Sequence, residues 1–555
     1  MRLLHVETLQ FGVYLGEDIP PYAILSHTWG DQEVSFQEIC ELQEWKAIPS
    51  HCRPRNPKVG VIRAKPGYRK IVEFIREVSL YEEVRYVWID TCCIDKSSSA
   101  ELQEAINSMF RWYAQADVCY AYLSDVSLHN DGKLDSSSFR VSRWFTRGWT
   151  LQELLAPKEV SFFDRKWNHL LARNTDADTD GLIESITGID QKFLRGDRVE
   201  LIFEASIATR MSWAAHRKTT REEDMAYALL GIFDISMPML YGEGKRAFGR
   251  LQEEIMKVSD DPSLLAWGFT DSMDPALTFR GDDGRILAQS PELFRYCGKL
   301  RPWERSQQLP SSFAITQKGF ELRLAIKLDP SHSALCYGII NCGLDSEDND
   351  DSNGSIPQHQ QVREYLAIPF ISTSAWKNQL IVGEFARADW LVPQLVSKAF
   401  THGATIQTIW IPRNQEIGPK LHMSLITAGD TLHPLLRAGY SIAGVYPPEP
   451  YLDGTIKYLS PLLQHKSGRD VCVKIYHLRR RGQEYLLIYD YELRWSEGVF
   501  MPYTDPNGPC SVYNMTGLFT LEFALAVATD KDLRNRLGTA ILEVDRGTVN
   551  PNAPF

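Results

Sequence analysis

Short apolar runs alternate with amphipathic helical segments through residues 22–163, and this alternation constrains the fold more than any other feature of the chain. The runs that have the length and apolar character of buried strands are 22–27, 84–90, 118–123 and 160–163. One predicted helix between them places these residues on a single face: Tyr68, Ile71, Val72, Ile75 and Val78. A capping box at Ser98–Glu101 begins another helix. Strands that alternate with helices predict an α/β domain whose parallel sheet is flanked by helices.

Polar side chains follow the predicted strands where each strand ends. They are Ser26, His27, Asp31, Asp90, Asp95, Ser124 and Asp125. In parallel sheets, ligands bind beyond the carboxyl ends of the strands, so these residues predict one polar, ligand-binding rim. Polar residues are also typical of any transition from strand to loop, and the pattern alone does not separate the two interpretations.

The segment Ser142–Pro157 contains two tryptophans, two arginines and a single carboxylate, Glu153. At helical spacing, Trp149 and Glu153 lie on one face. An apolar stripe adjoins that face and can bury the helix, and it consists of Leu151, Leu154 and Leu155. One interpretation is a purely structural amphipathic helix. The other is that the leucines hold the helix against the sheet while Glu153 faces the polar rim.

Composition excludes several classes of function. The net charge of -11 and the pI near 5.7 argue against nonspecific binding to nucleic acid or to an anionic membrane. The N-terminus lacks the apolar stretch of a secretory signal, and the best candidate membrane segment, Met515–Thr529, is interrupted by Glu522. The 10 cysteines show no metal-ligand or disulfide spacing, which favours a reducing, cytoplasmic compartment and predicts no metal site.

A chain of 555 residues is too long for one ordinary core. Residues 171–180 are polar and are interpreted as a linker. Helical segments follow: one begins at a capping box at Thr220–Glu223, and the last, at 247–258, begins after a turn at 242–245. Period-two alternation then predicts strands at 320–326, 405–411, 471–476 and 485–489. We therefore expect domains at 1–170 (α/β), 171–270 (helical extension) and 271–555 (β-rich and sandwich-like, with Asp345–Gln361 as a disordered acidic loop).

Three blocks of the chain together resemble the signature blocks of the fungal heterokaryon incompatibility (HET) domain, namely 22–30, 88–96 and 142–157. Three blocks in the expected order are far more specific than one short motif. A fourth block, 219–227 with 241–244, resembles the helical extension common in HET proteins. The resemblance covers residues 1–170 and implies a role in nonself recognition and programmed cell death in a fungus.

The HET domain is in turn similar to the TIR domain, which implies a TIR-like fold and a link to innate immunity. Catalytic TIR proteins are hydrolases that cleave NAD, and they carry a Ser-x-Trp-Cys-x-x-Glu-Leu block whose glutamate is catalytic. Residues 149–154 resemble that block and place the catalytic glutamate at Glu153. Arg147 stands where the block has its serine, and Thr150 where it has its cysteine. The alternative register keeps Ser142 as the serine but puts Gly148 at the glutamate position, so it is rejected.

The resemblance implies NAD as a substrate, with no bound cofactor or metal. Nicotinamide leaves as a neutral molecule, so one carboxylate can stabilise the oxocarbenium-like transition state without the general acid that ordinary glycosidases need. Ser26, Asp90 and Asp95 would orient ribose hydroxyls or water, Trp29 or Trp149 would stack on a ring, and His27 is a further binding residue or only a loop contact. The alternative is a noncatalytic signalling module. In either case we expect activation by self-assembly or by a partner protein.

Overall fold

The structure is a computed structural model of the chain. It describes residues 1–80, 83–173, 177–270, 285–303, 312–328, 335–344, 364–372, 385–387, 393–413, 441–446, 463–464, 470–480, 483–496, 499–503, 510–515 and 539–542. The predicted acidic loop Asp345–Gln361 and residues 516–529 of the apolar segment lie outside this range.

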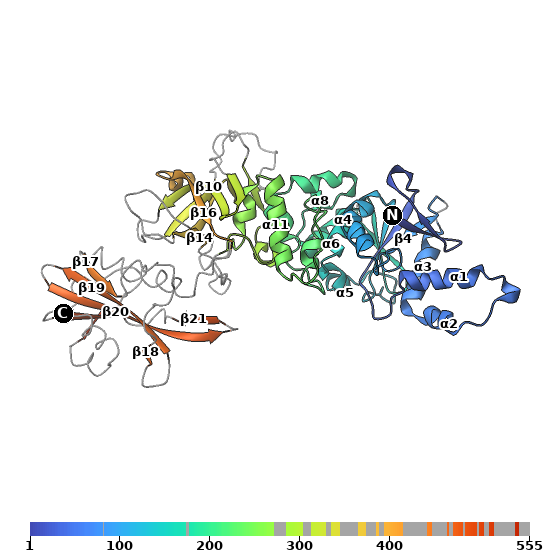
Figure 1. Cartoon of the computed structure of the whole chain (residues 1–555), viewed down its shortest axis with the longest axis horizontal. Coiled ribbons are helices and arrows are strands. Elements are labelled where there is room, and N and C mark those ends of the chain that lie inside the picture. The colour runs from blue at the N-terminus through green and yellow to red at the C-terminus, as the bar shows by residue number, and fades with distance from the viewer. Residues whose placement is uncertain are drawn as a thin grey trace. The chain divides into compact units, whose positions relative to one another are not determined.

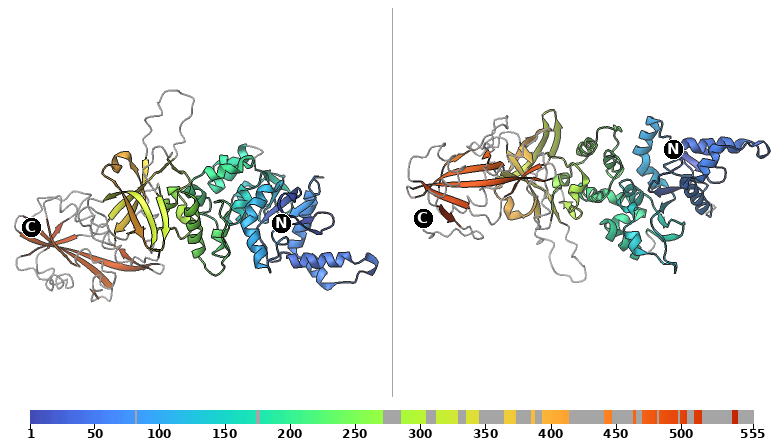
Figure 2. Two further views of the ribbon diagram at one scale, coloured as in Figure 1. Left: turned by 45° about the horizontal axis from the view of Figure 1, so that its top comes forward. Right: turned by 90° about the horizontal axis from the view of Figure 1, so that it is seen from below.

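The chain divides into two compact units (Figures 1 and 2). The first comprises Met1–Asp271, Leu287–Gln308 and Asn341–Glu364, and the second comprises Ser272–Ile286, Leu309–Ile340 and Tyr365–Phe555. All of the residues discussed below as a candidate site belong to the first unit.

The N-terminal sheet has the strand order β2-β1-β4-β3-β5-β6-β7. Its strands are β1 (Arg2–His5), β2 (Phe11–Val13), β3 (Tyr22–His27), β4 (Tyr86–Trp88), β5 (Val118–Tyr122), β6 (Val160–Phe163) and β7 (His169–Ala172). β3 pairs in parallel with β4 and β5, and β5 pairs in parallel with β6. Every residue of β3 is buried, as expected for a central strand covered on both faces. The four strands predicted from the sequence are confirmed.

The prediction of a purely parallel sheet is wrong at both edges. β1 is antiparallel to both β2 and β4, and β7 is antiparallel to β6. The connections from β1 to β2 and from β6 to β7 are each only five residues long, too short for the crossover that a parallel pair needs. The sheet is therefore mixed, with a parallel centre of four strands.

Helices of the α/β region connect these strands, and α1 and α2 project away from the sheet (Figure 1). They are α1 (Phe36–Ala47), α2 (Pro57–Ala64), α3 (Pro66–Val78), α4 (Ser99–Gln115), α5 (Ser136–Arg140) and α6 (Thr150–Leu155), with 3-10 helices η1 (Gly16–Asp18), η2 (Ser50–Cys52) and η3 (Arg143–Thr146). The predicted start of α4 is confirmed, since Ser98 Oγ accepts a hydrogen bond from the Glu101 amide. The second half of that capping box is absent because the Glu101 carboxylate instead accepts from Arg2 and from the Asp95 amide.

The buried face of α3 differs from the predicted one. Val72 is 42% exposed, and the buried residues include Lys70 and Phe74. A lysine buried on this face requires a partner in the interior, because burying an unpaired ammonium group is costly. That partner lies in the site described below.

The helical extension contains α7 (Ala177–Thr187), α8 (Gln191–Leu194), α9 (Ile207–Ser212), α10 (Asp224–Tyr227), α11 (Arg246–Val258), η4 (Gly196–Glu204), η5 (Pro262–Ala266) and η7 (Pro291–Phe294). The linker predicted at 171–180 is wrong at its two ends, which belong to β7 and α7, while residues 174–176 lie outside the described range. The capping box predicted at Thr220 is also wrong. The N-cap of α10 is Glu223, whereas Thr220 Oγ1 accepts from Arg147. The turn before α11 is confirmed and uses positive φ at Gly242 and Gly244.

Close packing between the extension and α4 leads to a prediction at Gly231. A Cβ atom there would lie 2.0 Å from the Cβ of Phe110, which cannot move without its backbone. We expect Gly231→Ala to destabilise the protein by about 1–3 kcal/mol, because an overpacked core must shift. Thermal unfolding measures this. Gly249→Ala, where nothing lies within 4 Å of the added methyl group, is the control and should be neutral or slightly stabilising. Equal melting temperatures for the two variants would contradict the prediction.

The remaining described strands are almost all in antiparallel sheets, as predicted for a β-rich region. One sheet contains β9 (Ser312–Thr316), β10 (Gly319–Leu328), β11 (Leu335–Ile340), β13 (Glu364–Ser372), β14 (Phe385–Arg387), β15 (Gln394–Ser397) and β16 (Thr405–Ile411), and η9 (Lys398–Thr401) follows β15. Phe320, Leu322, Leu324 and Ile326 are buried while Arg323 is exposed, which confirms the predicted alternation except at Ala325, which is also buried.

Two further sheets complete the described β structure. β8 (Leu300–Pro302) pairs with β12 (Cys342–Leu344). The other sheet contains β17 (Ser441–Tyr446), β18 (Leu463–Gln464), β19 (Asp470–Arg480), β20 (Gln483–Ser496), β21 (Val499–Tyr503), β22 (Cys510–Met515) and β23 (Thr539–Leu542). Across the described parts of the chain, no helix combines the length and the hydropathy that a transmembrane span requires.

Candidate functional site

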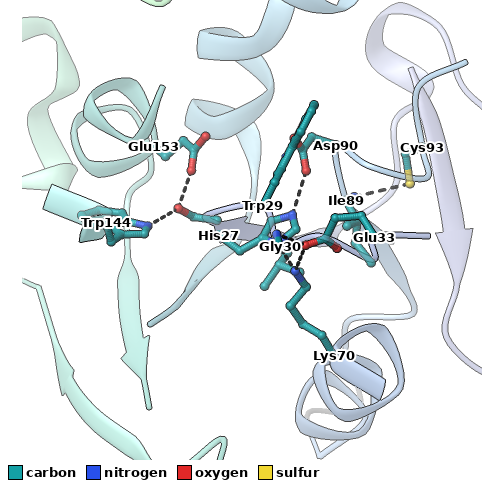
Figure 3. A network of polar contacts seen from close by, with 12 residues as sticks. His27, Trp29, Gly30, Glu33, Lys70, Ile89, Asp90, Cys93, Trp144 and Glu153 are labelled. Carbon is teal, nitrogen blue, oxygen red and sulfur yellow. Dashed lines mark hydrogen bonds and ion pairs between the residues drawn. The ribbon is translucent and has the colours of Figure 1, made fainter. Parts of the chain in front are cut away.

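A network of polar side chains lies at the carboxyl ends of two parallel strands, β3 and β4 (Figure 3). Ser26 and His27 are the last two residues of β3, and Asp90 follows β4 by two residues. Because β3 and β4 run in parallel, their carboxyl ends meet at the same edge of the sheet. Helix α6 brings Glu153 to this edge from a distant part of the sequence.

Glu153 is held against the end of β3. Ser26 Oγ donates a hydrogen bond to Glu153 Oε2 and accepts one from Trp144 Nε1 at 2.8 Å. The leucines of α6 are fully buried, so the helix packs by its apolar stripe while Glu153 reaches the edge of the sheet, as expected from the sequence. Glu153 itself is only 7% exposed.

Burial raises the pKa of Glu153 to about 8. The hydrogen bond from Ser26 and the positive charges of Arg147 and Arg217 favour the carboxylate, whereas the negative charge of Asp90 disfavours it. Glu153 is therefore largely protonated at pH 7 and ionises close to that pH. A pKa in this range suits a group that must be charged in one step and neutral in another.

Asp90 has the opposite electrostatic state. Burial disfavours its ionised form, but a hydrogen bond with His27 Nε2 (2.9 Å to Oδ1), the positive charge of Lys96 and a hydrogen bond from Trp29 Nε1 (2.7 Å to Oδ2) outweigh it and lower the pKa of Asp90 to about 2. At neutral pH, Asp90 is thus ionised while Glu153 is largely protonated. Two carboxyl groups with separated pKa values are a common arrangement for distinct chemical roles.

His27 connects Asp90 to two charged residues that the sequence did not single out. Lys70 Nζ contacts His27 Nδ1 and donates to Glu33 Oε1 at 2.6 Å. An ammonium group can only donate, so Nδ1 must be the acceptor and Nε2 must carry the proton that is donated to Asp90. Burial and the charge of Lys70 lower the pKa of His27, which is consistent with a neutral ring. Both ring nitrogens are thereby engaged within the protein.

Trp29 presents its indole at the surface of the site. Trp29 is 45% exposed, and Lys96 Nζ lies 3.7 Å from the centroid of its ring. Asp90 fixes the indole nitrogen. One face of the ring is therefore covered by a cation, and a planar ligand would stack on the opposite face.

Two residues expected at the site make their contacts elsewhere. Asp95 Oδ1 accepts from Gln37 Nε2 at 2.6 Å and from the Ser97 hydroxyl and amide, in a local turn. Trp149 hydrogen-bonds Asp224 of α10. Trp149 and Glu153 thus contact different elements although they lie one helical turn apart.

Trp144 and Lys70 are the main site residues that sequence reasoning missed. Trp144 lies in the segment Ser142–Pro157 singled out from the sequence. The alignment that would make Trp144 the tryptophan of the TIR block was rejected, because it puts Gly148 at the position of the catalytic glutamate. Ser142, instead of entering the site, donates to Asp125 Oδ1 at 2.7 Å and anchors the loop before η3. Lys70 directly precedes Ile71 on the apolar face of α3, and this position in the sequence could have indicated a buried lysine.

Within the described residues, no group of three or more His, Cys, Asp or Glu side chains could hold a metal ion.

Comparison with known proteins relates the N-terminal region to a family. Residues 22–141 match the family model described as Heterokaryon incompatibility protein (HET), so this part of the chain contains a HET domain. The chain is 44% identical over 289 residues to the vegetative incompatibility protein HET-E-1 of Podospora anserina. That match covers 51% of this chain and 19% of the relative, so the chain spans about a fifth of the relative's length. No solved structure matches the chain significantly.

Proposed function

We propose that this chain acts in fungal nonself recognition and programmed cell death, and that its N-terminal domain is a TIR-like hydrolase that cleaves the nicotinamide–ribose bond of NAD. The name of the relative, a vegetative incompatibility protein, supports the biological role. The observation that carries the enzymatic role is the hydrogen bond between Glu153 and Ser26 at the carboxyl end of β3. Parallel sheets bind their ligands at this edge, and Glu153 is the glutamate of the TIR-like block.

The proposed chemistry needs one ionised carboxylate. As the bond between nicotinamide and ribose breaks, its electron pair leaves with nicotinamide, and positive charge develops on the ribose. Ionised Glu153 stabilises this charge, and Ser26 holds the carboxylate in place. Water then forms the new bond to the anomeric carbon and releases a proton to solvent, giving ADP-ribose.

The electrostatics of the free site support binding of a cationic ring. Glu153 is largely protonated at pH 7 because it is buried. A nicotinamide ring carries positive charge, so its arrival would favour the ionised form of Glu153. Ionised Asp90 attracts the same charge and holds Trp29 by its indole nitrogen, and the face of Trp29 away from Lys96 is the stacking surface.

The test is nicotinamide release from NAD by the purified chain, followed over a series of protein concentrations. We expect the rate per molecule to rise with concentration if self-assembly completes the site, and to be constant if it does not. Glu159→Gln, which alters an exposed carboxylate near α6, is the control and should leave the rate unchanged. No nicotinamide release at any concentration, with or without a cell extract supplying partner proteins, would overturn the enzymatic proposal. Eight of the cysteines are free thiols, which suits the proposed cytoplasmic action: Cys40, Cys52, Cys92, Cys93, Cys119, Cys297, Cys336 and Cys342.

The burial of Glu153 favours a second candidate, a noncatalytic module that signals through self-assembly or partner binding. In that case, protonated Glu153 and Ser26 only join α6 to β3. Cell killing by a Glu153→Gln variant would separate the candidates, because the module would keep its activity and the hydrolase would lose it.

A further inference from the structure

The helical extension is bonded directly to the start of the helix that carries Glu153. The amide of Lys218 donates to Thr146 O at 2.7 Å, and the amide of Gly148 donates to Lys218 O at 2.8 Å. These bonds form an isolated parallel bridge between Arg147 and Lys218. The first turn of α6 is thereby tied to a segment about seventy residues further along the chain.

Arg217, next to this bridge, is a buried cation without a carboxylate among its hydrogen-bond acceptors. The residue is 5% exposed. Its Nη1 donates to Arg147 O and to Thr150 Oγ1, both at 2.9 Å, and its Nε donates to Trp213 O at 3.3 Å. All three acceptors are neutral. A buried guanidinium group is costly, so its charge requires compensation beyond these hydrogen bonds.

Glu153 compensates this charge when it is ionised. Burial lowers the pKa of Arg217 to about 9, and the negative charge of Glu153 opposes this shift. The other groups that act on Glu153 are the ionised Asp90, the guanidinium of Arg147, and the neutral Ser26, Tyr113 and Cys119. Of the two arginines that favour the carboxylate, Arg147 has the larger effect and Arg217 is the buried one.

We propose that Arg217 is a positioning residue for the Glu153 site: its hydrogen bonds to Arg147 O and Thr150 Oγ1 fix the first turn of α6, and its buried positive charge adds to that of Arg147 in favouring the carboxylate form of Glu153. The inference rests on the proposed catalytic role of Glu153. It makes the helical extension part of the site, although the matched family model ends at residue 141. Thr150 and Arg147, which depart from the TIR block, are the residues that hold this arginine.

The first test uses stability and needs no enzymatic activity. Thermal unfolding of the full chain is measured from pH 6 to pH 9 for wild type, Arg217→Gln, Glu153→Gln and the double variant. Loss of the Arg217 charge raises the pKa of Glu153 further, so the melting temperature of Arg217→Gln should fall increasingly below that of wild type as the pH rises. With glutamine at position 153, the effect of Arg217→Gln should be independent of pH below pH 8, where Arg217 keeps its proton.

A structural role alone would give the same loss of melting temperature at every pH and in both backgrounds, and this result would overturn the proposal. If Arg217→Gln does not fold, the double variant decides: folding restored by Glu153→Gln supports the charge coupling, and a double variant that also fails to fold contradicts it.

The second test is the pH profile of nicotinamide release. We expect Arg217→Gln to move the profile of kcat/KM to higher pH by about one unit, which lowers kcat/KM about tenfold at pH 7, while the control Glu159→Gln retains the wild-type profile. An unshifted profile for Arg217→Gln would overturn the proposal. If no variant and no wild-type protein cleaves NAD, the proposed function fails, and the stability cycle still decides the role of Arg217.

Discussion

Glu153→Gln is expected to reduce nicotinamide release by at least about 10³-fold while the protein stays folded. Glutamine has nearly the same shape as glutamate and can keep a hydrogen bond with Ser26, but it cannot carry the negative charge that stabilises the transition state. The measurement is the initial rate at saturating NAD, with Glu159→Gln as the matched control. A rate within tenfold of wild type would remove Glu153 from the chemistry.

The pH dependence provides an independent check on the same residue. The ionised form is the active one, so kcat/KM should rise with pH and level off above the pKa of Glu153, which is about 8 in the free protein. The profile of kcat should level off at lower pH, because bound cationic nicotinamide favours ionisation. A rate that falls as the pH rises from 6 to 8 would contradict this assignment.

The stability of the fold should respond to pH through Glu153 in the opposite direction. The pKa of Glu153 is raised from 4.5 to about 8 on folding, so the native state binds more protons than the unfolded chain between these values. The contribution of Glu153 to the free energy of unfolding therefore decreases as the pH rises through this window. Glu153→Gln removes the decrease and should raise the melting temperature relative to wild type above pH 8.

Lys70→Met is expected to lower the free energy of unfolding by about 3–5 kcal/mol. The Lys70 ammonium group lies between His27 Nδ1 and Glu33 Oε1, and its side chain is only 9% exposed. Without it, a partly buried carboxylate keeps only the hydrogen bond from the Gly30 amide, and the ring nitrogen of His27 loses its donor. The measurement is urea unfolding at pH 7.

Two variants control this prediction. Lys58→Met removes a lysine whose side chain is 77% exposed and should change stability by less than about 0.5 kcal/mol. Glu33→Gln combined with Lys70→Met should recover part of the loss, because no unpaired charge then remains. Equal stabilities for Lys70→Met and Lys58→Met would contradict the prediction, because they would show that solvent reaches Glu33 and solvates its charge.

Local sequence patterns were sufficient for the centre of the N-terminal domain. Continuous apolar runs identified β3, β4, β5 and β6, because strands covered on both faces bury every side chain. The same patterns missed the antiparallel edges, since hydrophobic periodicity reports burial and carries no information on the direction of a neighbouring strand. The prediction of the buried face of α3 was wrong at Val72, which is exposed, and missed Lys70, which is buried. The reason is related, because the residues packed against a helix decide which of its faces is covered.

The sequence offered the placement of Glu153 beside the carboxyl end of β3 as one of two interpretations, and the leucine stripe of α6 could not decide between them because all six residues of this helix are buried. The neighbours of Glu153 were decided only by tertiary structure. Trp144 reaches Ser26, Lys70 reaches His27, and Arg217 reaches the start of α6 across long stretches of chain. A buried charged or polar group must find its partner wherever the fold brings one, and that partner leaves no mark in local spacing.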